Sequence, residues 1–126
     1  MLVDRGLRVA LTELANRSSV PVELQVAVPE SLPPHVETTT YFVVSEALTN
    51  VAKHSGARRV LVDVGVIDGQ VGIRVEDDGV GGAHASKGAG LAGLAQRLLA
   101  VDGRIELDSP DGGPTVLRAM IPLDGG

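Results

Sequence analysis

Cysteine is absent from this 126-residue chain, and aromatic residues make up only 2% of it. Without cysteine the protein has no disulfide, no thiol nucleophile and no thiolate metal site. Because the chain has one Tyr, one Phe and no Trp, stacking of nucleic-acid bases on aromatic side chains is nearly excluded as well. A formal net charge of -5 argues against a nucleic-acid-binding surface as well, so we expect no nucleic-acid partner.

Long apolar runs are also missing. No stretch is apolar over the length that a helix needs to cross a bilayer, and the N-terminus lacks the pattern of a signal peptide. The three histidines, His35, His54 and His84, are too widely separated to suggest a zinc site. We therefore expect a cytoplasmic domain that makes no contact with a membrane.

The chain is rich in aliphatic residues instead. Hydrophobic residues make up 44% of it, so a real core is possible, built from Val, Leu, Ile and Ala. The length suits one domain with one core, and we treat residues 1–126 as that domain. A helical pattern that is already under way at Leu2 is what a domain cut from a longer chain would show.

The hydrophobic periodicity predicts elements in the order helix, strand, helix, strand, strand, helix, strand, strand. Asp68-Gly69 is a strong hairpin signal, and Gly56 suits the end of the second helix. Hairpins require antiparallel pairs, so we predict an α/β (α+β) two-layer sandwich, a mixed, mostly antiparallel sheet of about five strands covered on one face by three helices. The expected helices are 2–16, 35–55 and 91–101, and the expected strands are 22–28, 58–67, 70–77, 104–108 and 115–121.

The long second helix carries a polar stripe on an otherwise apolar surface. At 3.6 residues per turn, four polar side chains fall close together on one face, while apolar side chains cover the opposite one. Carboxylate and amide oxygens are ligands that Mg²⁺ prefers, and a nearby lysine suits phosphate oxygens. A helix whose solvent-facing side simply holds polar residues is the alternative. The stripe is Glu46, Asn50, Lys53 and His54, and the opposite side is Tyr41, Val44, Leu48, Val51 and Ala52.

A strand with an acidic end leads into the first of two glycine-rich segments. Asp77 points to the same side as three apolar strand residues, so its carboxylate is aimed at the core and needs hydrogen-bond donors there. A ligand with an NH₂ group would supply one, whereas Asp78 points to solvent. The alternative is a simple turn in which Asp77 accepts a local amide. The apolar residues are Val71, Ile73 and Val75, and the glycines that would let the backbone approach a flat ligand are Gly79, Gly81 and Gly82.

The second glycine-rich segment, residues 87–94, opens the third helix. Free N–H groups at a glycine-rich helix start attract phosphate, and Lys87 and Arg97 would add positive charge. The segment also matches the dinucleotide pattern G-x-G-x-x-G, but that fingerprint follows directly on a strand within a βαβ unit. Here a loop precedes it and an antiparallel hairpin follows, which argues against a dinucleotide-binding oxidoreductase. A flexible loop of small residues packed against a helix is a further alternative.

In this order the three segments resemble the ATP-binding domain shared by gyrase, Hsp90-type chaperones, histidine kinases and mismatch-repair proteins, the GHKL or Bergerat fold. Glu46-x-x-x-Asn50-x-x-Lys53-His54 is similar to its N box, Asp77-x-Gly79-x-Gly81 to its G1 box, and Gly88-x-Gly90-Leu91-x-Gly93-Leu94 to its G2 box. The sequence of residues 46–57 resembles that of sensor histidine kinases of the NarL class; it reads Glu-Ala-Leu-Thr-Asn-Val-Ala-Lys-His-Ser-Gly-Ala. The resemblance covers roughly residues 24–122.

The resemblance implies a role for each matched residue. Asn50 would hold a Mg²⁺ that bridges the phosphates, and Glu46 would orient a Mg²⁺-bound water or polarise the nucleophile. Asp77 would accept the adenine amino group, while Lys53 and His54 would lie near the phosphates. Gly79 and Gly81 would shape the adenine pocket. Gly88 and Gly90 would hinge a lid over ATP, and Gly90 and Leu91 would lie near the phosphates. Gly82 and Gly93 would also take part in ATP binding.

Two departures from the pattern bear on activity. The segment between Gly82 and Gly88 lacks a phenylalanine-containing box and is very short, and the NarL class is similar in having a short lid. The phosphoacceptor helix pair is missing, because His54 belongs to the N box and neither His35 nor His84 has the acidic neighbour expected beside a phosphorylated histidine. The resemblance thus implies a chain that binds ATP but does not autophosphorylate alone.

The function implied by the resemblance is that of the catalytic domain of a two-component sensor histidine kinase that uses Mg²⁺ and ATP. It would donate the γ-phosphoryl group to a histidine on a dimerisation domain absent from this sequence, and through that kinase it would serve a response regulator. The parent kinase could be attached to a membrane. Two alternatives share the fold: a serine kinase of the anti-sigma type, and a nucleotide-binding regulatory module without transfer.

Overall fold

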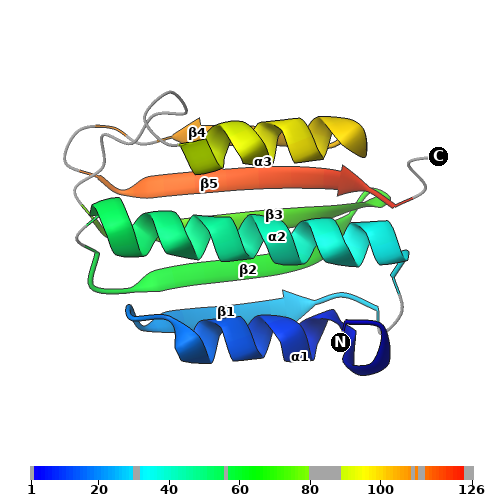
Figure 1. Cartoon of the computed structure of the whole chain (residues 1–126), viewed down its shortest axis with the longest axis horizontal. Coiled ribbons are helices and arrows are strands. Elements are labelled where there is room, and N and C mark those ends of the chain that lie inside the picture. Colours follow the sequence, from blue (N-terminus) through cyan, green and yellow to red (C-terminus); the bar gives the residue numbers. More distant parts are fainter. Residues whose placement is uncertain are drawn as a thin grey trace.

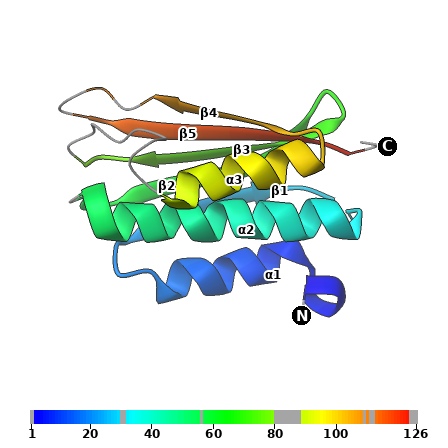
Figure 2. The same cartoon turned by 45° about the horizontal axis from the view of Figure 1, so that its top comes forward.

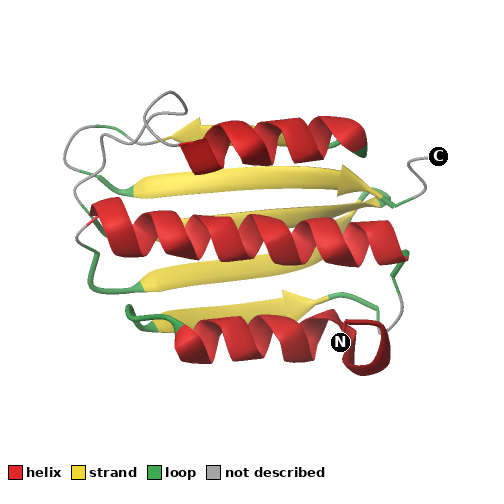
Figure 3. Ribbon diagram, in the orientation of Figure 1, coloured by secondary structure: helices red, strands yellow, loops and turns green. Residues whose placement is uncertain are grey.

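The structure is a computed structural model that describes residues 2–29, 32–55, 57–79, 89–108, 110 and 113–123 (Figure 1). Its helices and strands follow one another in the predicted order (Figure 3). The helices are α1 (Leu2–Arg17), α2 (Pro34–Asn50) and α3 (Ala89–Ala100), and the strands are β1 (Val22–Ala27), β2 (Val60–Ile67), β3 (Gln70–Asp77), β4 (Arg104–Asp108) and β5 (Thr115–Pro122).

The five strands form one sheet in the order β1-β2-β3-β5-β4. β1 runs parallel to β2, and the other neighbouring pairs are antiparallel, so the predicted mixed, mostly antiparallel sheet is confirmed. The hairpin between β2 and β3 turns at Asp68 and Gly69, both with positive φ, as the Asp-Gly signal predicts. All three helices cover the same face of the sheet (Figure 2).

Alternation along the strands explains this two-layer arrangement. Every second residue is buried throughout β3 and over residues 60–64 of β2, and the register places Val62 opposite Val75 and Val75 opposite Leu117. These rows meet the central helix α2, which contributes Val43 and Val44 to the core. The core within the described residues is aliphatic, as the composition predicts.

The long second helix differs from the prediction at its end. We expected one helix over 35–55, but α2 ends at Asn50 and residues Val51–Ser55 form a π-helical turn, η1. A π turn holds more residues than an α turn, so side chains beyond Asn50 are rotated away from the expected phase. Val51 is buried as predicted, whereas Ala52, expected on the apolar side, is exposed. Gly56, the expected end of the helix, lies outside the described residues.

Thr40, in the middle of α2, is fully buried, and its hydroxyl has no hydrogen-bond partner within the described ranges. Helical threonines usually donate to the carbonyl four residues earlier. Thr12 and Thr49 do so, at 2.8 Å and 2.9 Å. An unpaired buried hydroxyl costs about 1–3 kcal/mol, so this position lowers the stability of the chain.

We predict that Thr40→Val raises the free energy of unfolding by about 1 kcal/mol, because it removes the unpaired hydroxyl and keeps a β-branched side chain. Urea denaturation of both proteins measures the change. Thr49→Val is the matched control, since its hydroxyl is exposed and already bonded, and it should give no gain. A Thr40→Val protein no more stable than the wild type would contradict this account.

Candidate functional site

The three segments singled out in the sequence meet at one end of the molecule. The C-terminal end of α2 with η1, the end of β3 and the start of α3 lie together on the left in Figure 1. α2 and α3 lie side by side in opposite directions, so the start of α3 is next to the end of α2. The fold thus assembles residues that are far apart in the sequence.

Asp77 ends β3 with its side chain on the helix-covered face, as predicted. Only 4% of the residue is exposed. One carboxylate oxygen accepts the backbone N–H of Gly79 at 2.9 Å, so the local amide that we considered as an alternative is indeed bound. Burial raises the pKa of the Asp77 carboxyl above its ordinary value, although the Gly79 amide acts in the opposite direction. A carboxylate has about four positions that can accept a hydrogen bond. The Gly79 amide occupies one of them, so Asp77 can still accept a hydrogen bond from a ligand.

Asp78 is exposed, as predicted, but it is not merely a solvent-facing residue. Its Oδ1 accepts the backbone N–H groups of Arg58 and Arg59, at 2.8 Å and 3.1 Å. These two amides lower the pKa of the Asp78 carboxyl. The contact ties the end of β3 to the segment that follows η1. It also explains why β2 begins at Val60 and not at residue 58, because both preceding N–H groups are bound to Asp78.

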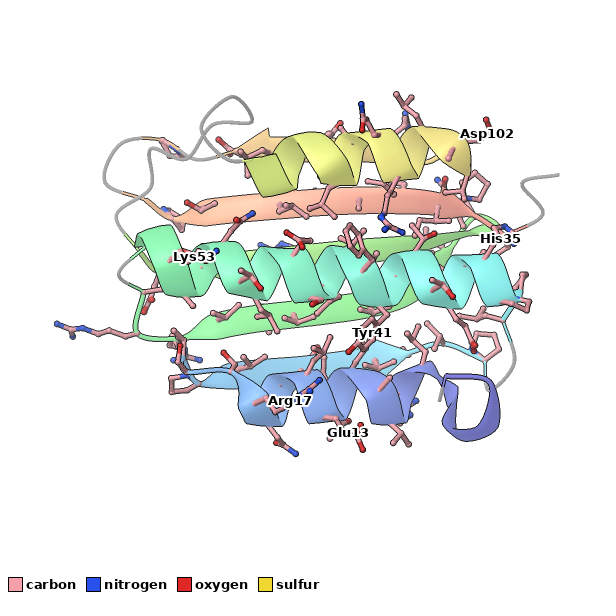
Figure 4. The ribbon with its side chains drawn as sticks, viewed as in Figure 1. Glu13, Arg17, His35, Tyr41, Lys53 and Asp102 are labelled. Carbon is pink, nitrogen blue, oxygen red and sulfur yellow. The ribbon has the colours of Figure 1, made fainter. Side chains whose placement is uncertain are left out.

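Asn50, in the polar stripe, has an unusual environment. Asn50 is the last residue of α2, and its buried Nδ2 has no hydrogen-bond partner in the part of the chain that the structure describes. A buried amide of this kind calls for a partner beyond the described residues, such as a water, an ion, a ligand or another part of the chain. Glu46, one turn earlier, is half-buried, and Lys53 is exposed at the end of the helix (Figure 4).

Gly93 lies inside α3, and a Cβ added there would meet no heavy atom of the described residues within 4 Å. Glycine in a helix interior costs about 1 kcal/mol relative to alanine, and packing within the described residues does not require it here. Gly90 is the second residue of α3. Further along the helix, the guanidinium carbon of Arg97 lies 3.8 Å from the centroid of the Phe42 ring on α2.

Several predicted site residues belong to parts of the chain that the structure does not describe. Gly81, Gly82, Lys87 and Gly88 lie outside the described residues, as do the side chains of His54 and Leu91. Among the side chains that are described, no group of three or more His, Asp or Glu forms a ready-made metal site. None of the described helices is both long enough and apolar enough to cross a membrane.

Sequence reasoning missed two contacts that shape this region. The Asp78 contact joins residues about twenty positions apart, and the Arg97–Phe42 contact joins α3 to α2. Arg97 was expected only to add positive charge. No local pattern marks either contact, because a turn aspartate and a helix arginine are both ordinary surface residues.

We predict that the two neighbouring aspartates affect stability with opposite pH dependence. The pKa of Asp77 is raised, so its contribution to the unfolding free energy is largest below the ordinary value of 3.8 and falls as pH rises through the raised pKa. The unfolding free energy of the wild type minus that of Asp77→Asn should therefore fall as pH rises. For Asp78, whose pKa is lowered, the same difference for Asp78→Asn should rise with pH through the range below 3.8.

Urea unfolding between about pH 3 and about pH 7 measures both differences. Each aspartate serves as the control for the other, since the substitutions are chemically the same. If both free-energy differences changed with pH in the same direction, burial of Asp77 would not be the reason that the pKa values of the two carboxyls differ.

Known proteins share both the sequence pattern and the fold. Residues 35–125 match the family described as "Histidine kinase-, DNA gyrase B-, and HSP90-like ATPase". The sensor histidine kinase ComP of Bacillus subtilis is 31% identical over 122 residues, which cover 89% of this chain and 16% of ComP. The nitrate/nitrite sensor protein NarX of Escherichia coli K12 is 32% identical over an alignment of 130 positions, and the match covers 96% of this chain and 22% of NarX.

Among solved structures, the blue-light activated histidine kinase EL346 of Erythrobacter litoralis is similar with a TM-score of 0.75. It is 22% identical, and the match covers 94% of this chain and 41% of that protein, which supports the fold. The family match covers most of the chain, and it includes the stripe of α2, the end of β3 and the start of α3. The chain therefore belongs to the family of histidine kinase-, DNA gyrase B- and HSP90-like ATPases, and its relatives there are sensor histidine kinases.

Proposed function

We propose that this chain is the ATP-binding catalytic domain of a longer sensor histidine kinase. It binds Mg-ATP and donates the γ-phosphoryl group to a histidine on a dimerisation domain outside this sequence, and that kinase then serves a response regulator. The chain spans less than a quarter of ComP and of NarX, which leaves room in such proteins for those further parts.

The observation that carries the proposal is the buried carboxylate of Asp77. A carboxylate at the end of a strand, 4% exposed and bonded to one nearby amide, is stabilised when a further donor reaches it. The amino group of adenine is such a donor. Gly79 stands beside this carboxylate, and Gly81 and Gly82 follow in a segment suited to close approach of a flat base.

The phosphates would lie between the end of α2 and the start of α3. Free N–H groups at the start of α3 favour negative charge, and the expected lid residues Gly88, Gly90 and Leu91 are at or next to this start. Asn50 fits a metal ion, because turning its amide by 180° puts the oxygen where the unpartnered Nδ2 now lies. Magnesium usually binds with substrate phosphates and few protein ligands, which suits a site without a ready-made cluster.

Transfer then needs positioning more than covalent chemistry. The bond between the γ-phosphorus and the oxygen bridging to the β-phosphate breaks, ADP leaves with that electron pair, and a nitrogen of the acceptor histidine bonds to phosphorus. Asn50 would hold a magnesium ion, which would supply neutralisation of charge on the phosphate oxygens. Glu46 would orient the attacking nitrogen or a water on the metal, Lys53 would add positive charge near the phosphates, and His54 would lie beside them.

Calorimetric titration of the chain with ATP, with and without Mg²⁺, tests the proposal, with NAD as the control. We predict that ATP binds and NAD does not. Asp77→Asn should weaken ATP and adenosine alike, by about 2–3 kcal/mol, because an amide presents NH₂ to the adenine NH₂. Asn50→Ala should weaken Mg-ATP and leave adenosine nearly unchanged.

These two variants control for each other. Unchanged ATP affinity in Asp77→Asn would remove the basis of the proposal. An Asn50→Ala protein that loses adenosine as strongly as Mg-ATP would show that Asn50 does not face the metal and phosphates.

We also predict that Gly93→Ala changes the stability of the chain and its affinity for ATP in opposite directions. The new methyl group has open space, so the free energy of unfolding should rise by about 0.5–1 kcal/mol through helix propensity. If ATP fills that space, ATP affinity should fall about tenfold or more, equivalent to about 1.4 kcal/mol. Thermal or urea unfolding and calorimetry measure the two effects.

Gly103→Ala, just beyond the other end of α3, is the control for adding a methyl group at a glycine that has no free space around it. Its Cβ would lie 2.7 Å from the Met120 carbonyl oxygen, so it should lower stability. A Gly93→Ala protein that is more stable and binds ATP normally would show that the space at Gly93 is not used by the nucleotide.

A further inference from the structure

The only phenylalanine of the chain packs against an arginine and lies at the edge of the core. Phe42 is half-buried, and the guanidinium carbon of Arg97 lies 3.8 Å from its ring centroid. A cation over a ring face within about 6 Å is attracted by the electrons of the ring. Arg97 is exposed, so this contact forms at the surface where α2 and α3 meet.

The two residues belong to stripes that lead toward the proposed phosphate site. The helices run side by side in opposite directions (Figures 1 and 2). Residues three or four apart share a helix face, and at about 1.5 Å per residue both stripes are about 10–12 Å long. A contact at one end of the stripes therefore places the start of α3 alongside the end of α2. The stripes are Phe42, Glu46 and Asn50 on α2, and Arg97, Gly93 and Gly90 on α3.

We propose that Arg97 is a positioning residue for the phosphate half of the site, which is the part between the end of α2 and the start of α3. Held against Phe42, it sets the register of α3 against α2 and so places the N–H groups at the start of α3 relative to Glu46 and Asn50. This inference rests on the proposed function, because it assigns the space between these groups to the phosphates of ATP.

The base half of the site, which is the part around Asp77, is held in place by other contacts. Asp77 is on β3, within the sheet, and the Asp78 contact ties that strand end to Arg58 and Arg59. Neither feature includes α3. Loss of the Arg97–Phe42 contact should therefore weaken a nucleotide that has phosphates and spare adenosine, which has none.

A matched control lies on the other side of the same helix. Tyr41, next to Phe42 in the sequence, accepts a hydrogen bond at its hydroxyl from Nη2 of Arg17 on α1, at 3.5 Å (Figure 4). This pair also joins an arginine of a flanking helix to an aromatic residue of α2. Because α1 carries none of the proposed phosphate ligands, Arg17→Met should leave nucleotide binding unchanged.

The experiment measures dissociation constants of Mg-ATP and adenosine by calorimetry for the wild type, Arg97→Met, Phe42→Leu, the double variant, Arg97→Lys and Arg17→Met. We expect each of the first two variants to bind Mg-ATP about three- to tenfold more weakly and adenosine within about twofold of the wild type. The double variant should be no weaker than the weaker single one, because both remove the same contact. Arg97→Lys should recover part of the affinity, since it keeps a cation over the ring.

Other results would overturn the inference. Equal losses for adenosine would mean a general structural role for Arg97. A loss in Arg97→Met without one in Phe42→Leu would mean that Arg97 binds phosphate directly, and additive losses in the double variant would mean that the two residues act separately. If the wild type binds neither Mg-ATP nor adenosine, the proposed function itself fails, whereas normal Mg-ATP binding by all the variants overturns only the role of Arg97.

Discussion

The packing of α2 against the sheet is the contact on which the rest of the molecule depends. The interior contains aliphatic side chains and no aromatic ones among its described buried residues, so helix and sheet meet through residues such as Val43 and Val44 on one side and Val62 and Ile73 on the other. Complete burial of one such side chain stabilises a protein by about 1.5–3 kcal/mol relative to exposure. This layer is what holds the end of α2 and the end of β3 in a fixed relation.

Unfavourable features gather where this packing ends. Asp77 is a buried carboxylate with a raised pKa. Within the described ranges, the buried amide nitrogen of Asn50 has no partner and packing does not require a glycine at position 93. Each feature lowers the stability of the free chain, and all three border the proposed ligand space. Local rules of folding are most often broken at functional sites, so their common location supports a binding role. The unpaired hydroxyl of Thr40 lies in the core, and nothing in the structure explains it.

Most of the fold was predictable because it follows from local patterns. Alternation of valines over residues 60–66 specifies a strand with one buried face, and the same alternation correctly placed Asp77 in the interior. The position of β5 between β3 and β4 had no such local signal. The π turn was missed because Val51–Ser55 has the composition of an ordinary helix, and its geometry depends on the structure around it.

The two halves of the candidate site are supported by different kinds of contact. The base half is supported by the backbone hydrogen bonds of the sheet and by the bonds from Arg58 and Arg59 to Asp78. The proposed phosphate half lies between two helices, which are joined by side-chain contacts such as that of Arg97 with Phe42. Backbone bonds fix a strand end more closely than one exposed cation–π contact, worth about 0.5–1 kcal/mol, can fix a helix. A nucleotide that bridges both halves would therefore bind its base to a rigid element and its phosphates to an adjustable one, so that changes in the placement of α3 would control phosphate binding with little effect on recognition of the base.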